Sequence, residues 1–345
     1  MSAYDALVDG PEILYRYRRA IEVEVSRALP KSGSHQDEML RYQLGFVDDE
    51  LPSLGGKCLR PSLCLLACEA LGGDLDQALP IAVALEFVHN FSLIHDDIED
   101  GDETRYHRPA LWRVYGRDHA IAAGVGLWAL AYQTLNRSAA RGLPASRVLA
   151  ARRILNDACG EMIEGQHQDL SFEQRTDVTL VEYLGMVERK TAALLGAALK
   201  LGGLVAGADE AEVDRLAAFG RQLGLAFQIR DDILGIWGEG SATGKPVGAD
   251  IARRKKSLPI IHAFEQTAGP DRALLRAVYS LPAIEDEEID AVLAVLQRWN
   301  CRYFAQGLAE DYRARAMAAL ATAHIPAEAR LRFDELTSFI LERDY

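Results

Sequence analysis

The sequence lacks a basic excess, a paired set of cysteines and a long apolar run. Its 345 residues carry 51 acidic and 38 basic side chains, which gives a formal net charge of −13. A nucleic-acid-binding protein usually presents a basic surface, so this charge argues against nucleic acid as a partner. The same charge would repel an anionic substrate unless bound metal ions offset it.

The five cysteines form no C-x-x-C pair, and their odd number does not fit a complete set of disulfides. Cys64 and Cys68 could share a helix face, but buried free thiols in a reducing compartment are the commoner case. No uninterrupted apolar run reaches the ~18 residues that cross a bilayer. The first residues also lack the basic and apolar regions of a secretion signal. We therefore expect a cytoplasmic protein without a membrane span.

Alanine and leucine dominate over valine, isoleucine and threonine, and strand-like alternation is scarce. This composition predicts a mostly helical fold. No linker, low-complexity segment or fixed repeat interrupts it, so we expect one all-α domain over residues 1–345. Polar loops are predicted at 101–110 and 238–257. Helices are predicted over about 10–30, 36–48, 61–71, 76–100, 117–140, 145–170, 178–206 and 209–237, and again after residue 257.

An acidic cluster ends the helix predicted over 76–100. Asp96 and Asp100 are four residues apart, so their carboxylates would lie about 5–6 Å apart on one helix face. His89 lies seven residues before Asp96 on the same stripe. Two like charges at this spacing repel, but the spacing suits Mg²⁺, which binds one or two carboxylates and takes water or phosphate oxygens for the rest. Taken alone, the cluster could also be a solvated helix end.

A second acidic pair, Asp231 and Asp232, follows another apolar helical run. Gln228 precedes the pair by three and four residues, so it would point the same way. Phosphate-bearing substrates bridged to carboxylates by Mg²⁺ need this combination of acids and separate cations. The cations are Lys57 and Arg60, beside Gly55-Gly56, and Lys245, Lys255 and Lys256 downstream.

Taken together, these motifs resemble the trans-isoprenyl diphosphate synthases of the farnesyl and geranylgeranyl diphosphate synthase type, from about residue 40 to the C-terminus. The resemblance implies an all-α bundle around a deep central cavity, usually as a homodimer. The matching segments are Gly-Gly-Lys-Cys-Leu-Arg-Pro (55–61), His-Asn-Phe-Ser-Leu-Ile-His-Asp-Asp-Ile-Glu-Asp (89–100), Glu-Gly-Gln-His-Gln-Asp-Leu (164–170), Lys-Thr (190–191), Phe-Gln-Ile-Arg-Asp-Asp-Ile-Leu-Gly (227–235) and Gly-Lys-Pro (244–246) with Asp250 and Lys255.

The resemblance also implies the site residues. Mg²⁺, three ions per active site, would be held by Asp96, Asp100 and Asp231, with Asp97 in support. Isopentenyl diphosphate would bind at Lys57, Arg60 and His89. An allylic diphosphate (dimethylallyl, geranyl or farnesyl) would bind at Arg105, Lys190, Thr191, Gln228, Lys245 and Lys255.

Product length is implied by the residues below the first acidic motif. Phe91, five residues before Asp96, matches the aromatic position associated with farnesyl or geranylgeranyl products, and Ser92 next to it is smaller. Helical phase places Phe91 about 140° from Asp96, so a plain core phenylalanine is an equally good interpretation.

Four positions depart from the family pattern: Cys58 and Tyr106 stand where arginines are usual, and Val125 and Gly235 where aspartates are usual. The missing arginine at Tyr106 normally touches isopentenyl diphosphate. The leading hypothesis is nevertheless a Mg²⁺-dependent prenyltransferase with a C15–C20 product, above all geranylgeranyl diphosphate. The alternatives are a class I terpene synthase on the same scaffold and a non-catalytic partner subunit. The retained metal acids argue against the second alternative.

Overall fold

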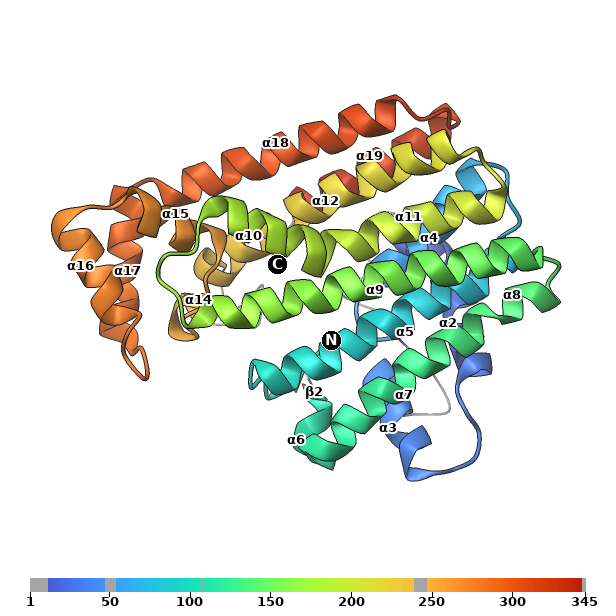
Figure 1. Cartoon of the computed structure of the whole chain (residues 1–345), viewed down its shortest axis with the longest axis horizontal. Coiled ribbons are helices and arrows are strands. Elements are labelled where there is room, and N and C mark those ends of the chain that lie inside the picture. The colour runs from blue at the N-terminus through green and yellow to red at the C-terminus, as the bar shows by residue number, and fades with distance from the viewer. Residues whose placement is uncertain (1–11, 47–53, 107, 239–246, 343–345) are drawn as a thin grey trace. The chain divides into compact units, whose positions relative to one another are not determined.

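The computed structural model describes residues 12–46, 54–106, 108–238 and 247–342, which are almost entirely helical (Figure 1). This confirms the predicted all-α fold. The strands within these ranges, β1 (Thr104–Arg105) and β2 (Arg108–Pro109), form one antiparallel hairpin. The helices are α1 (Ile13–Arg16), α2 (Arg18–Ala28), α3 (His35–Leu44), α4 (Leu59–Ala70), α5 (Leu75–Glu99), α6 (Leu111–Tyr115), α7 (Arg117–Leu135), α8 (Arg137–Ala140), α9 (Ala145–Glu173), α10 (Leu180–Val187), the π-helix η2 (Glu188–Ala192), α11 (Ala193–Ala206), α12 (Glu210–Trp237), α14 (Ala249–Ala252), α15 (Leu258–Gln266), α16 (Gly269–Val278), α17 (Asp286–Arg298), α18 (Cys301–Ala321) and α19 (Ala327–Glu342).

The predicted helices exist, and the differences lie in short elements. The helix predicted over 10–30 is interrupted at Tyr17, between α1 and α2, and the helix predicted over 117–140 is interrupted at Asn136, between α7 and α8. The helix predicted over 178–206 contains the π-helix η2. The loop predicted over 101–110 contains the β1–β2 hairpin, and the loop predicted over 238–257 contains α14. Elements of two to five residues carry too little periodicity to be read from sequence.

The chain divides into two compact units. Unit 1 comprises Met1–Cys159, Ala197–Ala217 and Ala323–Phe333, and unit 2 comprises Gly160–Gly196, Ala218–Thr322 and Asp334–Tyr345. One domain over residues 1–345 and a deep central cavity both stay predictions.

Helix α5 is the central element of unit 1. It packs against α4, α7 and α2, and Figure 1 shows it running alongside α7. Leu85, Phe87 and Val88 are fully buried, because apolar residues occupy nearly every face of this helix. The Asp74 carboxylate caps its start by accepting a hydrogen bond from the Asp76 amide at 2.9 Å. The acidic motif is thereby carried at the end of a well-packed core helix.

Pro80 lies inside α5 and removes one hydrogen bond from it. A proline has no N–H to offer to the carbonyl four residues earlier, which here belongs to Asp76. The Arg141 guanidinium donates to this carbonyl at 2.9 Å. The same guanidinium pairs with the buried carboxylate of Glu24, 2.5 Å away. A long-range contact thus replaces the bond that the proline removes.

Helix α5 also meets the length and composition test for a membrane span. Among the described residues it is the single such helix, with a mean hydropathy of 1.3 over its most apolar window. The expectation of no membrane span was based on uninterrupted apolar runs alone, and this criterion does not detect α5. Within the chain, 67% of that window is buried, which is the behaviour of a core helix.

The core of unit 2 supports the segment that follows the second acidic motif. Helix α17 begins with a capping box between Glu285 and Glu288 and turns its apolar face inward. Helix α14 and the start of α15 pack onto the same core, so residues 249–260 rest on buried apolar surface. The main buried members are Ile236, Ile251, Ile260, Phe264, Leu275, Val292, Val295 and Leu296.

Candidate active site

The first acidic motif occupies the C-terminal end of α5 in unit 1. Asp97 is buried, Asp96 is half-buried, and Asp100 is exposed and caps the helix. The negative end of the helix dipole disfavours carboxylates by about 0.3–1 kcal/mol each. Carboxylates placed against this gradient would be stabilised by a bound cation.

Asp97 is paired with the Arg105 guanidinium, which comes from β1. Arg105 Nε donates to Asp97 Oδ1 at 2.9 Å, and Nη2 donates to the same oxygen. Burial raises the pKa of the Asp97 carboxyl, although Arg105 acts in the opposite direction. The other carboxylate oxygen, Oδ2, is buried and has no hydrogen-bond partner among the described residues. A buried acceptor of this kind fits a bound cation or water.

His89 lies two turns before the motif, among cations. Burial lowers the pKa of its imidazole well below the ordinary value, and the charges of Arg60 and Arg105 lower it further. The ring is therefore neutral and can donate one N–H to an anion. The buried Glu86 lies one turn earlier, and burial raises the pKa of its carboxyl despite Arg60 and Arg18 nearby. Arg60, Arg105 and the neutral His89 could together bind an anion.

Lys57 and Arg60 flank the start of α4, and both are half-buried. Cys58 between them is 3% exposed, and its φ of 50° places it in the left-handed region. Burial raises the pKa of its thiol. Since the Cys58 side chain is turned into the core, the departure at this position does not place a thiol beside the two cations.

Phe91 is half-buried and lies against α7. Its ring meets the His95 ring edge to face at 4.9 Å between centroids. A Cβ on Gly124 of α7 would come within 3.6 Å of the Phe91 ring and 2.5 Å of His95 Nε2. The Ser92 hydroxyl donates to the His89 carbonyl at 2.8 Å. These contacts fit both a core phenylalanine and a product-length residue, so the role of Phe91 stays a prediction.

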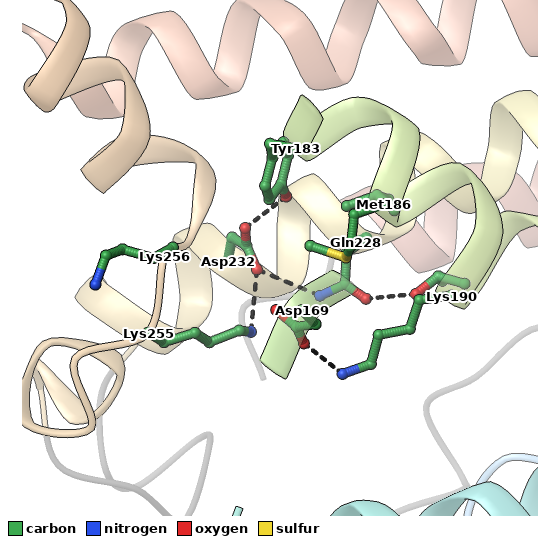
Figure 2. A pocket seen from close by; sticks show the side chains of 10 residues that line it. Asp169, Tyr183, Met186, Lys190, Gln228, Asp232, Lys255 and Lys256 are labelled. Carbon is green, nitrogen blue, oxygen red and sulfur yellow. Dashed lines mark hydrogen bonds and ion pairs between the residues drawn. The ribbon is translucent and has the colours of Figure 1, made fainter. Parts of the chain in front are cut away.

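Unit 2 contains a pocket built from the second group of predicted residues. Figure 2 shows the Tyr183, Gln228 and Lys255 side chains converging on Asp232, with the Lys190–Asp169 pair beside them. The pocket is lined by Asp169, Tyr183, Met186, Val187, Lys190, Thr191, Gln228, Asp232, Lys255 and Lys256.

Asp232 is the hub of this pocket and is 1% exposed. Its Oδ2 accepts from the Tyr183 hydroxyl at 2.6 Å and from the Leu258 amide at 2.8 Å. Its Oδ1 accepts from Lys255 Nζ at 3.2 Å and Gln228 Nε2 at 3.3 Å. Four donors occupy this carboxylate, so its role is to orient them. The half-buried Asp231 beside it is the better candidate for a metal ligand.

The π-helix η2 presents Lys190 and Thr191 to the pocket. Lys190 Nζ donates to Asp169 at 2.5 Å, and the Thr191 hydroxyl donates to Gln228 Oε1 at 2.8 Å. A Cβ on Gly165 of α9 would lie 2.3 Å from the Lys190 amide nitrogen, and one on Gly224 of α12 would lie 2.5 Å from the Ala192 Cα. Two glycines therefore let α9 and α12 approach η2 closely. Short π segments occur frequently at functional sites.

Lys255 pairs with Asp250, whose carboxylate lies against Gly235. Lys255 Nζ lies 3.6 Å from the Asp250 carboxylate. Burial opposes the charge on Lys255, but Asp250 and Asp232 raise its pKa well above the ordinary value. A Cβ on Gly235 would lie 2.2 Å from Asp250 Oδ2. A larger residue at Gly235 would therefore require the Asp250 carboxylate to move, and the departure at Gly235 has no structural explanation.

The structure brings the predicted site residues together within each unit, and the role of each residue stays a prediction. Lys245 lies outside the described residues. Asp169 and Tyr183 were missed as pocket residues, although Asp169 stands in the Glu-Gly-Gln-His-Gln-Asp-Leu segment that carried the resemblance. Lys256 was named among the cations and also lines the pocket. Lys256 donates to the Glu173 and Arg254 carbonyls, and Figure 2 shows its ammonium group turned away from Asp232.

The chemistry of the donors fits Mg²⁺. Within the described ranges, no group of three or more His, Cys, Asp or Glu side chains could by itself hold an ion. Mg²⁺ commonly needs only one or two carboxylates and completes its shell with water and phosphate oxygens. Asp96 and Asp100, beside the orphaned oxygen of Asp97, supply such a partial shell.

Comparison with known proteins identifies the family. The polyprenyl synthetase family matches residues 47–296. The chain is 38% identical over 315 residues to a (2E,6E)-farnesyl diphosphate synthase of Mycobacterium tuberculosis, which covers 90% of this chain and 86% of that enzyme. It is 39% identical over 316 residues to a geranylgeranyl diphosphate synthase of the same organism, covering 90% and 89%. A polyprenyl synthetase from Streptomyces coelicolor A3(2) superposes with a TM-score of 0.86 at 36% identity, covering 96% of this chain and 99% of that one. The chain therefore belongs to the polyprenyl synthetase family, the trans-isoprenyl diphosphate synthases, and is a trans-prenyltransferase.

Proposed function

We propose that the chain condenses an allylic diphosphate with isopentenyl diphosphate and releases a C15–C20 trans-prenyl diphosphate, with geranylgeranyl diphosphate as the product. The observation that carries the proposal is the unit 2 pocket, where Lys190, Gln228 and Lys255 lie around Asp232 of the second acidic pair (Figure 2). Convergent donors of this kind bind the leaving diphosphate of an allylic substrate.

The allylic diphosphate would be bound by groups whose orientation is fixed. Thr191 donates to Gln228 Oε1, so the Gln228 amide nitrogen faces Asp232. Asp169 holds Lys190, and Asp232 holds Lys255. Fixed donors reorganise little when negative charge develops on the leaving group. Arg105 and Lys245 complete the proposed set.

Asp96, Asp100 and Asp231 would hold Mg²⁺, three ions per active site, with Asp97 holding Arg105 in place. When bound, Mg²⁺ supplies Lewis-acid stabilisation of the charge on the leaving diphosphate. The orphaned Oδ2 of Asp97 supports a cation at the first motif.

Isopentenyl diphosphate would bind at Lys57, Arg60 and His89. Two cations take the diphosphate, and the neutral imidazole donates one hydrogen bond. The allylic C–O bond breaks and leaves a carbocation. The isopentenyl double bond attacks it, and the intermediate gives a proton to the departed diphosphate. No protein base is needed in this sequence of steps.

Phe91 would limit the product, with Ser92 leaving room beside it. The contact between Phe91 and α7 supports a wall at this depth. The five cysteines, all free and buried, support the reducing, cytoplasmic location expected from the sequence.

The proposed homodimer would use an exposed apolar stripe on α7. Ile121, Val125 and Trp128 are 40%, 50% and 38% exposed and share one helix face. Val125 stands where the family usually has aspartate, and an apolar residue there extends the stripe. We expect V125E to convert a dimer into a monomer in light scattering. An unchanged mass would remove α7 from the interface.

One assay separates the candidate functions. Purified protein with Mg²⁺ and farnesyl diphosphate is incubated with and without isopentenyl diphosphate, and the products are analysed by chromatography and mass. A longer diphosphate that forms only with both substrates is expected. A hydrocarbon or alcohol from farnesyl diphosphate alone would instead identify a terpene synthase.

The terpene synthase alternative rests on Tyr106, whose neutral phenol lies over Gly55-Gly56 where the family has an arginine. It predicts ionisation without condensation. A non-catalytic partner subunit would give no product in either arm of the assay.

A further inference from the structure

Tyr106 has an unusual backbone conformation. It occupies the turn between β1 and β2, in which Arg105 pairs with Arg108. Its φ is 52°. Two-residue hairpin turns favour positive φ but normally use glycine or asparagine, and a bulky residue rarely adopts it. Such a conformation persists where the surrounding structure holds it, often for a functional reason.

The Tyr106 ring covers the backbone of Gly55 and Gly56. A Cβ on Gly55 would lie 2.6 Å from Cδ2 of the ring, and a Cβ on Gly56 would lie 2.8 Å from the phenol oxygen. Gly56 has a φ of 77°, whereas Gly55 does not have a positive φ. Gly55 is therefore required for the contact with Tyr106 rather than for its own backbone conformation.

Contacts from α2 and α3 also hold the loop of residues 54–56, independently of Tyr106. Arg18 on α2 donates to the Gly56 carbonyl at 3.0 Å and also to the Leu54 carbonyl. The buried Glu22 pairs with Arg18 at 3.0 Å. The Gly55 amide donates to the Leu44 carbonyl at 3.3 Å. The loop of residues 54–56, called the glycine loop below, is thus anchored by α2 and α3, and Tyr106 covers it.

The hairpin that carries Tyr106 also carries Arg105, which pairs with Asp97 of the acidic motif. The glycine loop leads directly into Lys57 and Arg60. Tyr106 thereby connects the acidic motif to the segment that bears the two cations. Its phenol stays protonated, because burial raises its pKa. It can pack and donate a hydrogen bond, but it cannot supply charge to a diphosphate.

We propose that Tyr106 is a positioning residue for the second substrate, whose ring holds Gly55-Gly56 so that Lys57 and Arg60 are presented to isopentenyl diphosphate. The inference rests on the proposed function. In this chain, binding of isopentenyl diphosphate depends on the packing of a tyrosine over two glycines.

The first test is a double-mutant cycle between Gly55 and Tyr106. G55A places a methyl group against the ring, and Y106A removes the ring. Each is expected to raise the KM for isopentenyl diphosphate at least tenfold, with kcat and the KM for farnesyl diphosphate within twofold of wild type. Y106F keeps the ring and should restore the wild-type KM. G160A is the matched control, since a Cβ on Gly160 meets open space.

The double variant G55A/Y106A decides the coupling. Without the ring, the new methyl group has room, so the KM of the double variant should equal that of Y106A alone. If the KM increases of the two single variants multiplied in the double variant, Gly55 and Tyr106 would act independently, and the inference would be overturned. It would also be overturned if Y106F were as impaired as Y106A, or if kcat and both KM values changed together.

Hydrogen exchange tests, without any measurement of catalysis, whether the Tyr106 ring holds Gly55-Gly56. Amides in a peptide covering residues 54–60 should exchange at least tenfold faster in Y106A than in wild type and Y106F, while peptides from α17 stay unchanged. Equal exchange in Y106A and wild type would overturn the inference even in an active enzyme. The protein could also show the faster exchange in Y106A and yet make no elongated prenyl diphosphate. That result would support the contact of Tyr106 with Gly55-Gly56 and refute the proposed function.

Discussion

Adding one methyl group at Gly165 should impair the enzyme through the π-helix. A Cβ there would lie 2.3 Å from the Lys190 amide nitrogen and 2.7 Å from the Lys190 Cα, against an ordinary contact of 3.4 Å or more. Both neighbours are backbone atoms, so a side-chain rotation cannot relieve the overlap. In G165A, α9 and η2 must separate by roughly 1 Å, a shift on the scale at which packing is strongly felt.

This separation acts directly on the pocket. Asp169 lies one turn after Gly165 on α9 and accepts from Lys190 Nζ at 2.5 Å. Moving α9 away from η2 stretches this bond and displaces Lys190. A misplacement of about 1 Å can lower turnover about 100-fold. Overpacking should also lower the free energy of unfolding by about 1–3 kcal/mol.

G160A is the matched control on the same helix. Both substitutions gain the same helix propensity, about 0.5–1 kcal/mol, but a Cβ on Gly160 meets open space. The variants are compared by kcat with saturating substrates and by urea unfolding. We expect G160A to match wild type or exceed it in stability, and G165A to lose about two orders of magnitude in kcat. If G165A matched G160A in both measurements, the close approach of α9 to η2 would not matter.

Three further predictions follow from individual contacts. Y183F removes one of the four donors to the buried Asp232 carboxylate, so urea unfolding should show a loss of about 1.5–3 kcal/mol, and a loss below about 0.5 kcal/mol would contradict the network. Burial lowers the pKa of Lys256 from 10.5 to about 8, so the unfolded chain binds more protons between these pH values. The stability of wild type relative to K256M should therefore rise from pH 8 to pH 10.5, and a constant difference would refute the shift. F91A should lengthen the product beyond that of wild type in the mass assay, whereas an unchanged length would leave Phe91 as a core residue.

Much of the fold was readable from sequence because its signals are local. Helical periodicity and the scarcity of strand patterns predicted the long helices, including α5 and α12 with their acidic motifs. Spacing alone placed Asp96 and Asp100 on one helix face. The hairpin, α6 and the π-helix were missed, because two to five residues carry no distinguishable period.

The acidic motifs, the cations in sequence order and the helical class were determined by the sequence itself, since each depends on neighbours within about two helical turns. Tertiary structure decided that Asp232 is buried while Asp231 beside it is half-buried. Asp232 became the buried hub through Tyr183 and Leu258, 49 and 26 positions away in the chain. Tertiary structure also placed the Tyr106 ring over Gly55-Gly56. Contacts between residues so far apart in sequence depend on how helices pack, and no local pattern encodes them.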